Sequence, residues 1–566
     1  MAQSKSLKKP LLGRPEEDDI HSENNSAAGD RDESGDGSGS SGAPGGSWLL
    51  IAGLLIAMLF SALEGTIVGT AMPRIVGELG GLSLMTWLTT AYMLSSTTVV
   101  PIAGKLADLL GRKSVYVTGL LIFMLGSALC GMAQNMTQLI WFRALQGIGG
   151  GVMMPMAMII VGDIFTGKQR AKWQGVFGAI FGLASVIGPQ VGGWIVDAWN
   201  WHWVFYINLP VGILATVLIA LGLKSHKAAG PVKFDIAGMA TMIVGVVSLL
   251  LALSFGGGQY PWGSWQIIGL FALSFAALTA FVRIESTASE PILPVRLFRD
   301  RIFSVVNAIG FLMSIGMFGA IMFVPLFMQG IVGISASASG TVMTPMMVTM
   351  ILASIAGGQL VLKIGVRPQM TAGMIIMACG FLLLTTLGME TTKLYASGIM
   401  LVIGLGMGLV MPLLTLTLQE HFPKSELGVV TSSSTFFRQI GGTFGMTLLG
   451  VVMNSRSDAL LSANLLPLLH DLPAEADGLE ESITHMVHTN PQSLYSALLS
   501  PESLAQIPQA LLGSLVPVIK ASLVASLHAV FWTGLAFVLF GALLTPLLGR
   551  VTVSGRSKEP EEAAAE

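Results

Sequence analysis

The feature that most constrains this chain is a series of long apolar runs separated by shorter polar segments. Crossing about 30 Å of hydrocarbon at about 1.5 Å per residue takes about 20 apolar residues in a helix. Fourteen runs reach that length, and only 11% of all residues are charged. The sequence therefore predicts an all-α polytopic membrane protein with fourteen transmembrane helices, at 48–71, 85–103, 114–134, 138–161, 171–195, 202–223, 234–254, 265–284, 302–328, 338–362, 369–388, 395–418, 428–453 and 524–548.

Positive charge is divided unevenly between the two sets of connecting loops. If the first helix leaves the cytoplasm, the inner loops carry sixteen Lys and Arg residues and the outer loops carry four. Short loops that stay in the cytoplasm are enriched in these residues. The asymmetry predicts that both termini lie in the cytoplasm, which agrees with an even number of helices.

Three segments lie outside the predicted helices. Residues 1–46 are rich in Ser, Gly, Asp and Glu and are expected to form a disordered cytoplasmic tail, because they cannot bury enough apolar surface. Residues 454–520 are expected to form a long extracellular loop, which is either an interfacial helix or cap over the outer vestibule or a tolerated insertion. Residues 549–566 are expected to form a second cytoplasmic tail.

Several classes of function find no support in the sequence. The formal net charge is -2 and no basic patch is interleaved with aromatics, so no nucleic-acid partner is expected. Cys130 and Cys379 lie in apolar runs, which indicates neither a disulfide framework nor a metal site. Neither a phosphate-binding loop nor a nucleophile–base motif occurs, so we expect no enzyme and no cofactor.

The two halves of the chain resemble each other. "GKLADLLGRKSVYVTGLLIF" follows the second run and aligns with "GQLVLKIGVRPQMTAGMIIM" after the tenth, which pairs Gly104 with Gly358 and Asp108 with Leu362. Repeated halves around a central binding region are typical of secondary transporters. We expect two six-helix bundles joined by a two-helix insert with its linker, at 47–223, 291–548 and 224–290 respectively.

Three charged residues, Glu64, Arg143 and Arg438, fall deep inside apolar runs, away from their ends. A charge at bilayer depth is costly unless it is paired, hydrated or protonated. Glu64 lies about 10 Å and Arg143 about 8 Å from the outer end of its helix, so the two share a depth. Desolvation favours the neutral acid, whereas a nearby guanidinium favours the carboxylate. We predict that Glu64 carries a proton with Arg143 as its partner, the alternative being a fixed ion pair that aligns helices; Arg438 is a secondary candidate.

Several motifs occur in the order of a known family. "GKLADLLGRK", "RALQGIGGG" and "GVFGAIFGLASVIGPQVGG" resemble the loop between helices two and three, the helix-four motif and the antiporter motif of the major facilitator superfamily. With "LEGTIVGTAMP", "WHWVFYINLPVG" and "FFRQIGGTFG", residues 48 to about 548 resemble its fourteen-helix drug:proton antiporter family, the EmrB and QacA type. The resemblance implies the major facilitator fold, with two six-helix bundles and a two-helix central insert.

The resemblance also implies a gating machinery. It assigns charged loop residues to a network that closes the inner gate, and helix-five glycines to a face that bends and slides. These gating candidates are Gly104, Asp108, Gly111, Arg112, Lys113, Asp163, Gly188, Pro189, Gly192 and Gly193. The alternatives are a solvated positive loop and tight helix packing without a gating role. In the family, the antiporter motif accompanies export in exchange for protons.

The chain departs from the family pattern at a few positions. Glu64 stands where Asp is usual, Leu109 replaces a frequent cation, Ala184 replaces a frequent glycine, and His202 stands where Arg is common. The longer acid keeps the titratable group. These departures affect the details of coupling rather than the class.

The function predicted from these features is proton-coupled, secondary active export of amphipathic drugs or toxic compounds by alternating access. The expected setting is a functional monomer in the plasma membrane, with small amphipathic substrates, protons and the lipid bilayer as partners. The alternatives are export of a native metabolite, siderophore or lipid, and a non-transporting receptor on the same scaffold. The titratable residues Glu64, Arg143 and Asp108 argue against the receptor. The sequence identifies no substrate-binding residue.

Overall fold

The computed structural model describes residues 46–80, 84–223, 234–257, 259–334, 336–470 and 509–549, and the single residues 484, 487 and 551. All of these residues belong to one compact unit, Gly45–Glu566. Apart from residues 46, 549 and 551, the expected tails at 1–46 and 549–566 lie outside the described residues, as does much of the expected loop at 454–520.

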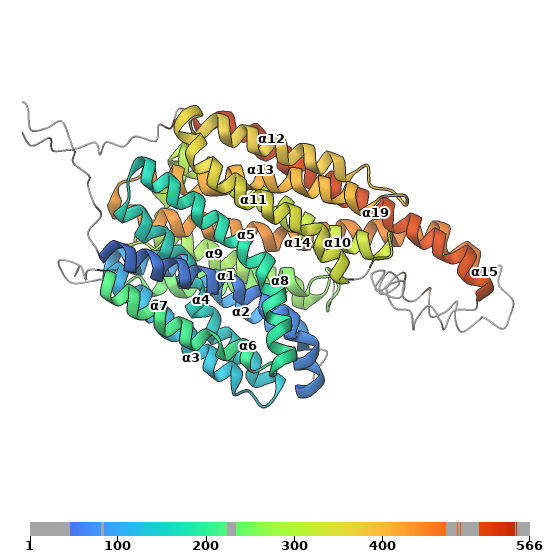
Figure 1. Cartoon of the computed structure of the whole chain (residues 1–566), viewed down its shortest axis with the longest axis horizontal. Helices are drawn as coiled ribbons and strands as arrows, with labels where there is room; N and C mark the ends of the chain where they lie inside the picture. Colours follow the sequence, from blue (N-terminus) through green and yellow to red (C-terminus); the bar gives the residue numbers. More distant parts are fainter. Residues whose placement is uncertain are drawn as a thin grey trace, which may run out of the picture. The chain divides into compact units, whose positions relative to one another are not determined.

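The described chain is built from long helices, as predicted (Figure 1). Among the described residues, thirteen helices are long and apolar enough to cross a membrane. The fourteenth long helix is α2, whose Thr, Ser, Lys and Asp residues lower its hydropathy. The first six spans are α1 (Gly46–Leu79), α2 (Met85–Leu110), α3 (Arg112–Gly131), α4 (Met136–Ile164), α5 (Gly167–Ala198) and the pair α6 (Trp203–Tyr206) and α7 (Asn208–Gly222).

Two further helices and a second set of six follow. The insert consists of α8 (Ile236–Phe255) and α9 (Trp265–Glu285). A short 3-10 helix, η2 (Val295–Arg299), leads to the second set: α10 (Arg301–Gly330), α11 (Ala336–Ile364), α12 (Val366–Leu384), α13 (Lys393–His421), α14 (Leu427–Asn464) and α19 (Gln509–Leu544). The fold class, an all-α polytopic membrane protein, is confirmed.

Polar side chains mark where several helices begin. Asn135, Asp235, Ser264 and Asp300 each accept a hydrogen bond from a backbone N–H in the first turn of α4, α8, α9 and α10 respectively. Such caps satisfy N–H groups that have no partner inside the helix, which typically contributes about 1 kcal/mol each. The helix starts are therefore encoded locally.

Helical structure extends into the range expected to be the long loop, 454–520. α14 continues to Asn464 and is followed by α15 (Leu466–His470), while α19 already begins at Gln509. The apolar run ends where Asn454, Arg456 and Asp458 begin, but backbone hydrogen bonding does not depend on hydropathy. A span read from hydropathy therefore ends earlier than the helix that contains it.

The two six-helix sets pack in the same way. The pairs α1·α5, α1·α7, α2·α4, α3·α4 and α3·α7 correspond to α10·α14, α10·α19, α11·α13, α12·α13 and α12·α19. The sequence alignment also pairs Gly111 with Gly365, and both adopt a positive φ, +90° and +84°, between two helices. Glycine tolerates this left-handed conformation without a steric penalty. The repeated sequence therefore corresponds to repeated structure.

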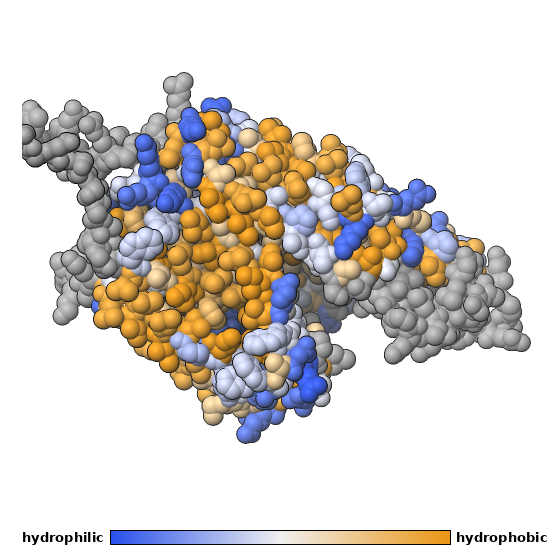
Figure 2. Space-filling model, in the orientation of Figure 1, coloured by the Kyte–Doolittle hydropathy of each residue, from blue (hydrophilic) through white to orange (hydrophobic). Residues whose placement is uncertain are grey.

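The two bundles contact each other through equivalent pairs of helices, α2 with α14 and α11 with α5. The insert helices pack on each other, and α8 also contacts α2 and α14. Figure 2 shows hydrophobic residues covering much of the visible face and hydrophilic residues gathered toward its ends. Large apolar side chains such as Leu221, Trp265 and Leu394 are more than 70% exposed in the absence of lipid. A surface of this kind is suited to hydrocarbon.

Candidate functional site

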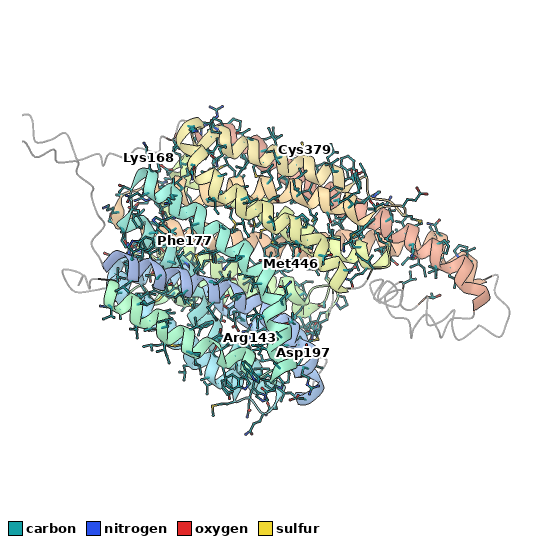
Figure 3. All side chains as sticks on the ribbon, in the orientation of Figure 1. Arg143, Lys168, Phe177, Asp197, Cys379 and Met446 are labelled. Carbon is teal, nitrogen blue, oxygen red and sulfur yellow. The ribbon has the colours of Figure 1, made fainter. Side chains whose placement is uncertain are left out.

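A buried ion pair joins α1 to α4 within the N-terminal bundle, at Arg143 in Figure 3. Arg143 Nη1 lies 2.5 Å from Glu64 Oε1, and the side chains are 2% and 1% exposed. Arg143 Nε also donates to the Leu88 carbonyl of α2 at 3.3 Å. The fold thus brings together the two charged residues that the sequence placed at one depth.

Uncharged polar side chains surround the ion pair. Asn208 Nδ2 donates to Glu64 Oε2 at 2.7 Å and to Ser127 Oγ at 3.0 Å. Gln146 accepts from Arg143 Nη1 at 2.7 Å through Oε1 and donates to Ser127 Oγ at 2.6 Å through Nε2. Both carboxylate oxygens of Glu64 therefore have a donor. A satisfied network of this kind stabilises a charge in a low-dielectric interior.

Two aromatic rings flank the guanidinium. Its Cζ lies 4.3 Å from the Tyr92 ring centroid and 5.9 Å from that of Phe205. Arg over an aromatic face gains a cation–π attraction that grows when water is excluded. The site is therefore an enclosed acid whose cationic partner, Arg143, contacts side chains of α2, α4 and α6, while α7 supplies the Asn208 amide to the acid.

A second site lies at the end of the molecule where α2 meets α3, called the α2–α3 end below. Asp108 Oδ1 and Oδ2 accept the backbone N–H groups of Gly428 and Val429 at 3.2 and 3.1 Å, at the start of α14 in the other bundle. A carboxylate at a helix N-terminus is favoured by the free N–H groups and the helix dipole. A Cβ on Gly104, one turn earlier, would overlap Ser432 of α14, so glycine permits the approach.

Basic residues around Asp108 have different partners. Arg112 Nη1 pairs with Asp108, and Arg112 Nε donates to Asp163 Oδ2 of α4 at 2.8 Å. Lys113 instead donates to the Ala220 carbonyl of α7 at 2.6 Å. Arg112 therefore joins the two carboxylates, whereas Lys113 stands apart from them in this structure.

Burial raises the pKa of Asp108 to about 6, against the opposing effect of Arg112. The residue lies beyond the apolar stretch 85–103, in the last turns of α2. Its charge therefore changes near neutral pH, which an ordinary Asp with a pKa of about 3.9 does not do.

A second contact between the bundles at the same end centres on Arg170, near the start of α5 beside Lys168 in Figure 3. Arg170 Nη1 lies 2.8 Å from Glu420 Oε1 and 2.7 Å from the Gln419 carbonyl, both at the end of α13. Its other nitrogens donate to the carbonyls of Phe165, at 2.9 Å, and Gly162. Glu420 also accepts from the backbone N–H of residue 167, the first residue of α5.

The side chain of Gln419 ties four helices together. Its Nε2 donates to the Met158 carbonyl of α4 at 2.9 Å and to Thr431 Oγ1 of α14 at 3.0 Å. Its Oε1 accepts from Gln174 Nε2 of α5 at 2.9 Å. This junction is buried and belongs to both bundles.

The antiporter-motif glycines of α5 do not share one environment. A Cβ on Gly188 or Gly192 would overlap Thr66 or Thr70 of α1, whereas a Cβ on Gly193 would meet nothing within 4 Å. The helix continues through Gly188 and Pro189 and ends only at Ala198. Two of the predicted glycines therefore permit close packing on α1, and Gly193 does not take part.

Arg438, the secondary candidate, lies on α14 with 6% of its surface exposed. Within the described part of the chain it forms no hydrogen bond, ion pair or ring contact. None of the contacts described for Glu64, Arg143 or Arg438 links Arg438 to the Glu64–Arg143 pair.

Sequence reasoning missed Gln146, Asn208, Gln419 and Glu420. All are polar residues at or inside the ends of apolar runs. That position is the feature of the sequence that could have identified them as functional candidates. No group of three or more His, Cys, Asp or Glu side chains among the described residues could hold a metal ion.

Two bundles of membrane-spanning helices with a buried acid–base pair define a polytopic membrane protein of the transporter type. The family model of the Major Facilitator Superfamily matches residues 54–235 and 236–446. The chain belongs to this superfamily.

Among known proteins, the chain is 66% identical to the Multidrug transporter protein MdtP of Bacillus subtilis over 514 residues, 91% of this chain and 95% of that protein. It is 35% identical to the Multidrug resistance protein 3 of the same organism, covering 91% of this chain and 96% of that protein. The human organic anion transporter MFSD10 has a similar structure, with a TM-score of 0.58 at 14% identity, covering 89% and 100% of the two chains. The last likeness concerns the fold alone.

Proposed function

We propose that this chain is a proton-coupled antiporter that exports amphipathic small molecules. The observation that carries the proposal is the enclosed Glu64–Arg143 pair, in a chain that is 66% identical to a multidrug transporter. An acid held this far from water has to be protonated whenever its cation is withdrawn, because an unpaired charge there is too costly. Withdrawal of Arg143 would therefore be linked to proton uptake by Glu64, with Asn208 and Gln146 as the positioning residues.

The proposed orientation places the α2–α3 end in the cytoplasm of a cell-membrane protein, together with both termini. The support is the count of sixteen Lys and Arg residues in one set of loops against four in the other. Arg112, Lys113, Lys168 and Arg170 all belong to the basic set. The protein would function as a monomer, because each monomer contains the complete repeat pair.

Alternating access would use the contacts between the bundles as an inner gate. Asp108 and Arg170 both join one bundle to the other at the α2–α3 end. The proposed gate comprises these contacts and the predicted gating residues Gly104, Asp108, Gly111, Arg112, Asp163, Gly188, Pro189 and Gly192. Two other predicted residues are left out of it, because Lys113 donates to the Ala220 carbonyl and Gly193 meets nothing on α1. Gly188 and Gly192 would allow α1, which carries Glu64, to slide on α5. Opening or closing of the gate would thereby move α1 and change the surroundings of Glu64.

Export of a native metabolite, siderophore or lipid would use the same residues, and only the cargo would differ. A receptor would not need an acid with a single exchangeable cationic partner, which favours transport. The test is uptake of fluorescent amphiphiles into inverted membrane vesicles, with and without a collapsed pH gradient. Gradient-dependent uptake is expected. Uptake that persists unchanged after the gradient collapses would contradict proton coupling.

A further inference from the structure

Arg438 is a cation in the interior of the molecule to which no described residue supplies a counter-charge. Ten residues separate it from Gly428 near the start of α14, a distance of about 15 Å along the helix axis, which places it near mid-membrane. Its residue surface is 6% exposed, and among the described residues nothing bonds to it. The other interior cation, Arg143, has Glu64. A cation at this depth is costly unless an anion or water accompanies it.

The face of α14 that carries Arg438 points to the region where the bundles meet. Arg438 follows Thr431 by seven residues, and residues seven apart lie on nearly the same helix face. Thr431 is bonded to Gln419, which also contacts Met158 of α4 and Gln174 of α5 in the N-terminal bundle. Arg438 therefore lies about two turns further into the membrane on the side that forms this junction.

The surroundings of Arg438 suit an apolar molecule. The next turn contains Gly441 and Gly442, where a Cβ would overlap the backbone of Phe311 and the ring of Phe318 respectively, both on α10. The rings of Phe311 and Phe444 also lie together, with centroids 5.7 Å apart. Gly442 follows Arg438 by four residues and shares its helix face, so the partly exposed ring of Phe318 lies about one turn from the cation.

We propose that Arg438 binds an anionic group, such as a carboxylate, on the transported amphiphile, while the neighbouring aromatic side chains hold its apolar body. This inference rests on the proposed export function and narrows its substrates to amphiphiles that are anionic or zwitterionic. A guanidinium is the side chain best matched to a carboxylate, because its N–H groups can donate two parallel hydrogen bonds.

The probes are rhodamine B, which carries a carboxylate, and its ethyl ester, which has the same cationic ring system without that charge. Binding of each dye to the purified full-length protein is measured by fluorescence polarisation. We expect wild-type protein to bind rhodamine B roughly tenfold more tightly than the ester, as a charge-assisted pair would give. Arg438→Gln should abolish the preference without weakening ester binding, because the ester has no anionic group for Arg438 to hold, and Arg438→Lys should retain part of the preference.

Ester binding serves as the folding control for both variants. Should wild-type protein bind the ester as tightly as rhodamine B, the proposal is overturned whatever the variants do. The proposal is also overturned if folded Arg438→Gln still binds rhodamine B more tightly than the ester. The binding series is repeated in chloride buffer and in gluconate buffer, to test whether Arg438 pairs with an inorganic ion instead. Ester binding that depends on chloride only when Arg438 is present would show that an inorganic ion pairs with Arg438, and would overturn the proposal.

Efflux of both dyes from proteoliposomes with an imposed pH gradient separates this proposal from the proposed function. An Arg438-dependent preference in binding without gradient-driven efflux would support the site and contradict proton-coupled export. Gradient-driven efflux of both dyes without a preference would contradict the site and leave export standing.

Discussion

Asp108 and Glu420 lie in opposite bundles, and each carboxylate meets the first backbone N–H groups of a helix in the other bundle. Asp108 of α2 binds the start of α14, and Glu420 of α13 binds the start of α5. Each acid also pairs with an arginine, Arg112 or Arg170. The α2–α3 end is therefore closed by two interactions of the same kind, one on each side of the pseudo-symmetric interface.

Asp108→Asn should weaken this closure without preventing membrane insertion. An amide keeps the shape but loses the charge at the helix terminus, which is worth about 1–2 kcal/mol, or roughly a 5- to 30-fold shift in the closing equilibrium. Labelling of a reporter Ser354→Cys, buried between α5 and α11, measures opening in a background without Cys130 and Cys379. Asp197→Asn, an exposed acid at the far end of α5, is the matched control. Equal labelling of both variants would leave Asp108 without a gating role.

Closure should also depend on pH at the α2–α3 end. Because burial raises the pKa of Asp108 to about 6, against the effect of Arg112, its charge is present above that pH and is lost as pH falls through it. Labelling of the Ser354→Cys reporter is divided at each pH by labelling of the same cysteine in unfolded protein, because only the thiolate reacts and its fraction falls with pH. This relative labelling should rise as pH drops from about 7.5 to about 5. The charged groups beside Asp108 are Arg112 and Asp163, so Asp108→Asn should give high labelling that no longer changes over this range. A pH response that survives in Asp108→Asn would assign it to another group.

Arg170 and Glu420 should differ in importance although they form one ion pair. Removing either charge breaks a buried pair, which costs about 3–5 kcal/mol. Arg170 additionally serves three backbone carbonyls, so Arg170→Gln should lower the melting temperature more than Glu420→Gln. Exchanging the two residues should not restore stability, because a glutamate at 170 cannot donate to those carbonyls. Thermal unfolding in detergent measures all three variants, and full recovery in the exchange would mean that charge alone matters.

The two glycines Gly188 and Gly193 provide a matched pair for helix packing. Gly188→Ala places a methyl group against Thr66 of α1, and overpacking of this kind typically costs about 1–3 kcal/mol. Gly193→Ala meets nothing within 4 Å and should behave like wild type. Melting temperature and initial transport rate should both fall in Gly188→Ala alone. If both variants transport at wild-type rates, sliding of α1 on α5 is not needed.

The sequence predicted the spans, the repeat and the depth shared by Glu64 and Arg143, because these depend on hydropathy and helix rise. It could not predict Glu420, since the sequence repeat pairs Asp108 with Leu362 of α11, whereas the structure supplies the second acid from α13. Contacts between bundles are set by packing across large sequence separations. Composition likewise predicted a glycine-rich face on α5 without resolving which glycines face α1.

Helix geometry explains why Gly188 and Gly192 face α1 whereas Gly193 does not. Gly188 and Gly192 are four residues apart and therefore share a face, whereas Gly193 is rotated by about 100° from Gly192. Lys113 is a similar case, since its place in a basic loop motif implied the carboxylate network, yet its ammonium reaches the Ala220 carbonyl. Local sequence constrains which face a residue occupies, but only the packed structure identifies its partner.

Replacing Glu64 by glutamine removes the acid from the buried ion pair. In Glu64→Gln the amide cannot accept from both Arg143 and Asn208, which now donate to the two carboxylate oxygens. The Arg143 charge is left without its partner, so we expect a lower melting temperature, by the equivalent of about 3–5 kcal/mol. Stability alone cannot separate a proton carrier from a fixed ion pair, because both lose the same contacts. Transport has to be measured in two modes.

If Glu64 carries the proton, Glu64→Gln should lose gradient-driven efflux and proton release on substrate addition, yet keep substrate exchange across proteoliposomes without a gradient. A fixed pair that only aligns helices would instead reduce both modes together. Glu64→Asp should keep coupled transport with a shifted pH profile, because moving the carboxylate by about 1.5 Å changes the balance between ion pairing and desolvation. Glu390→Gln, an exposed acid in a loop, is the control. Gradient-driven efflux at the wild-type rate in Glu64→Gln would place the proton carrier elsewhere and leave the ion pair as a structural link between α1 and α4.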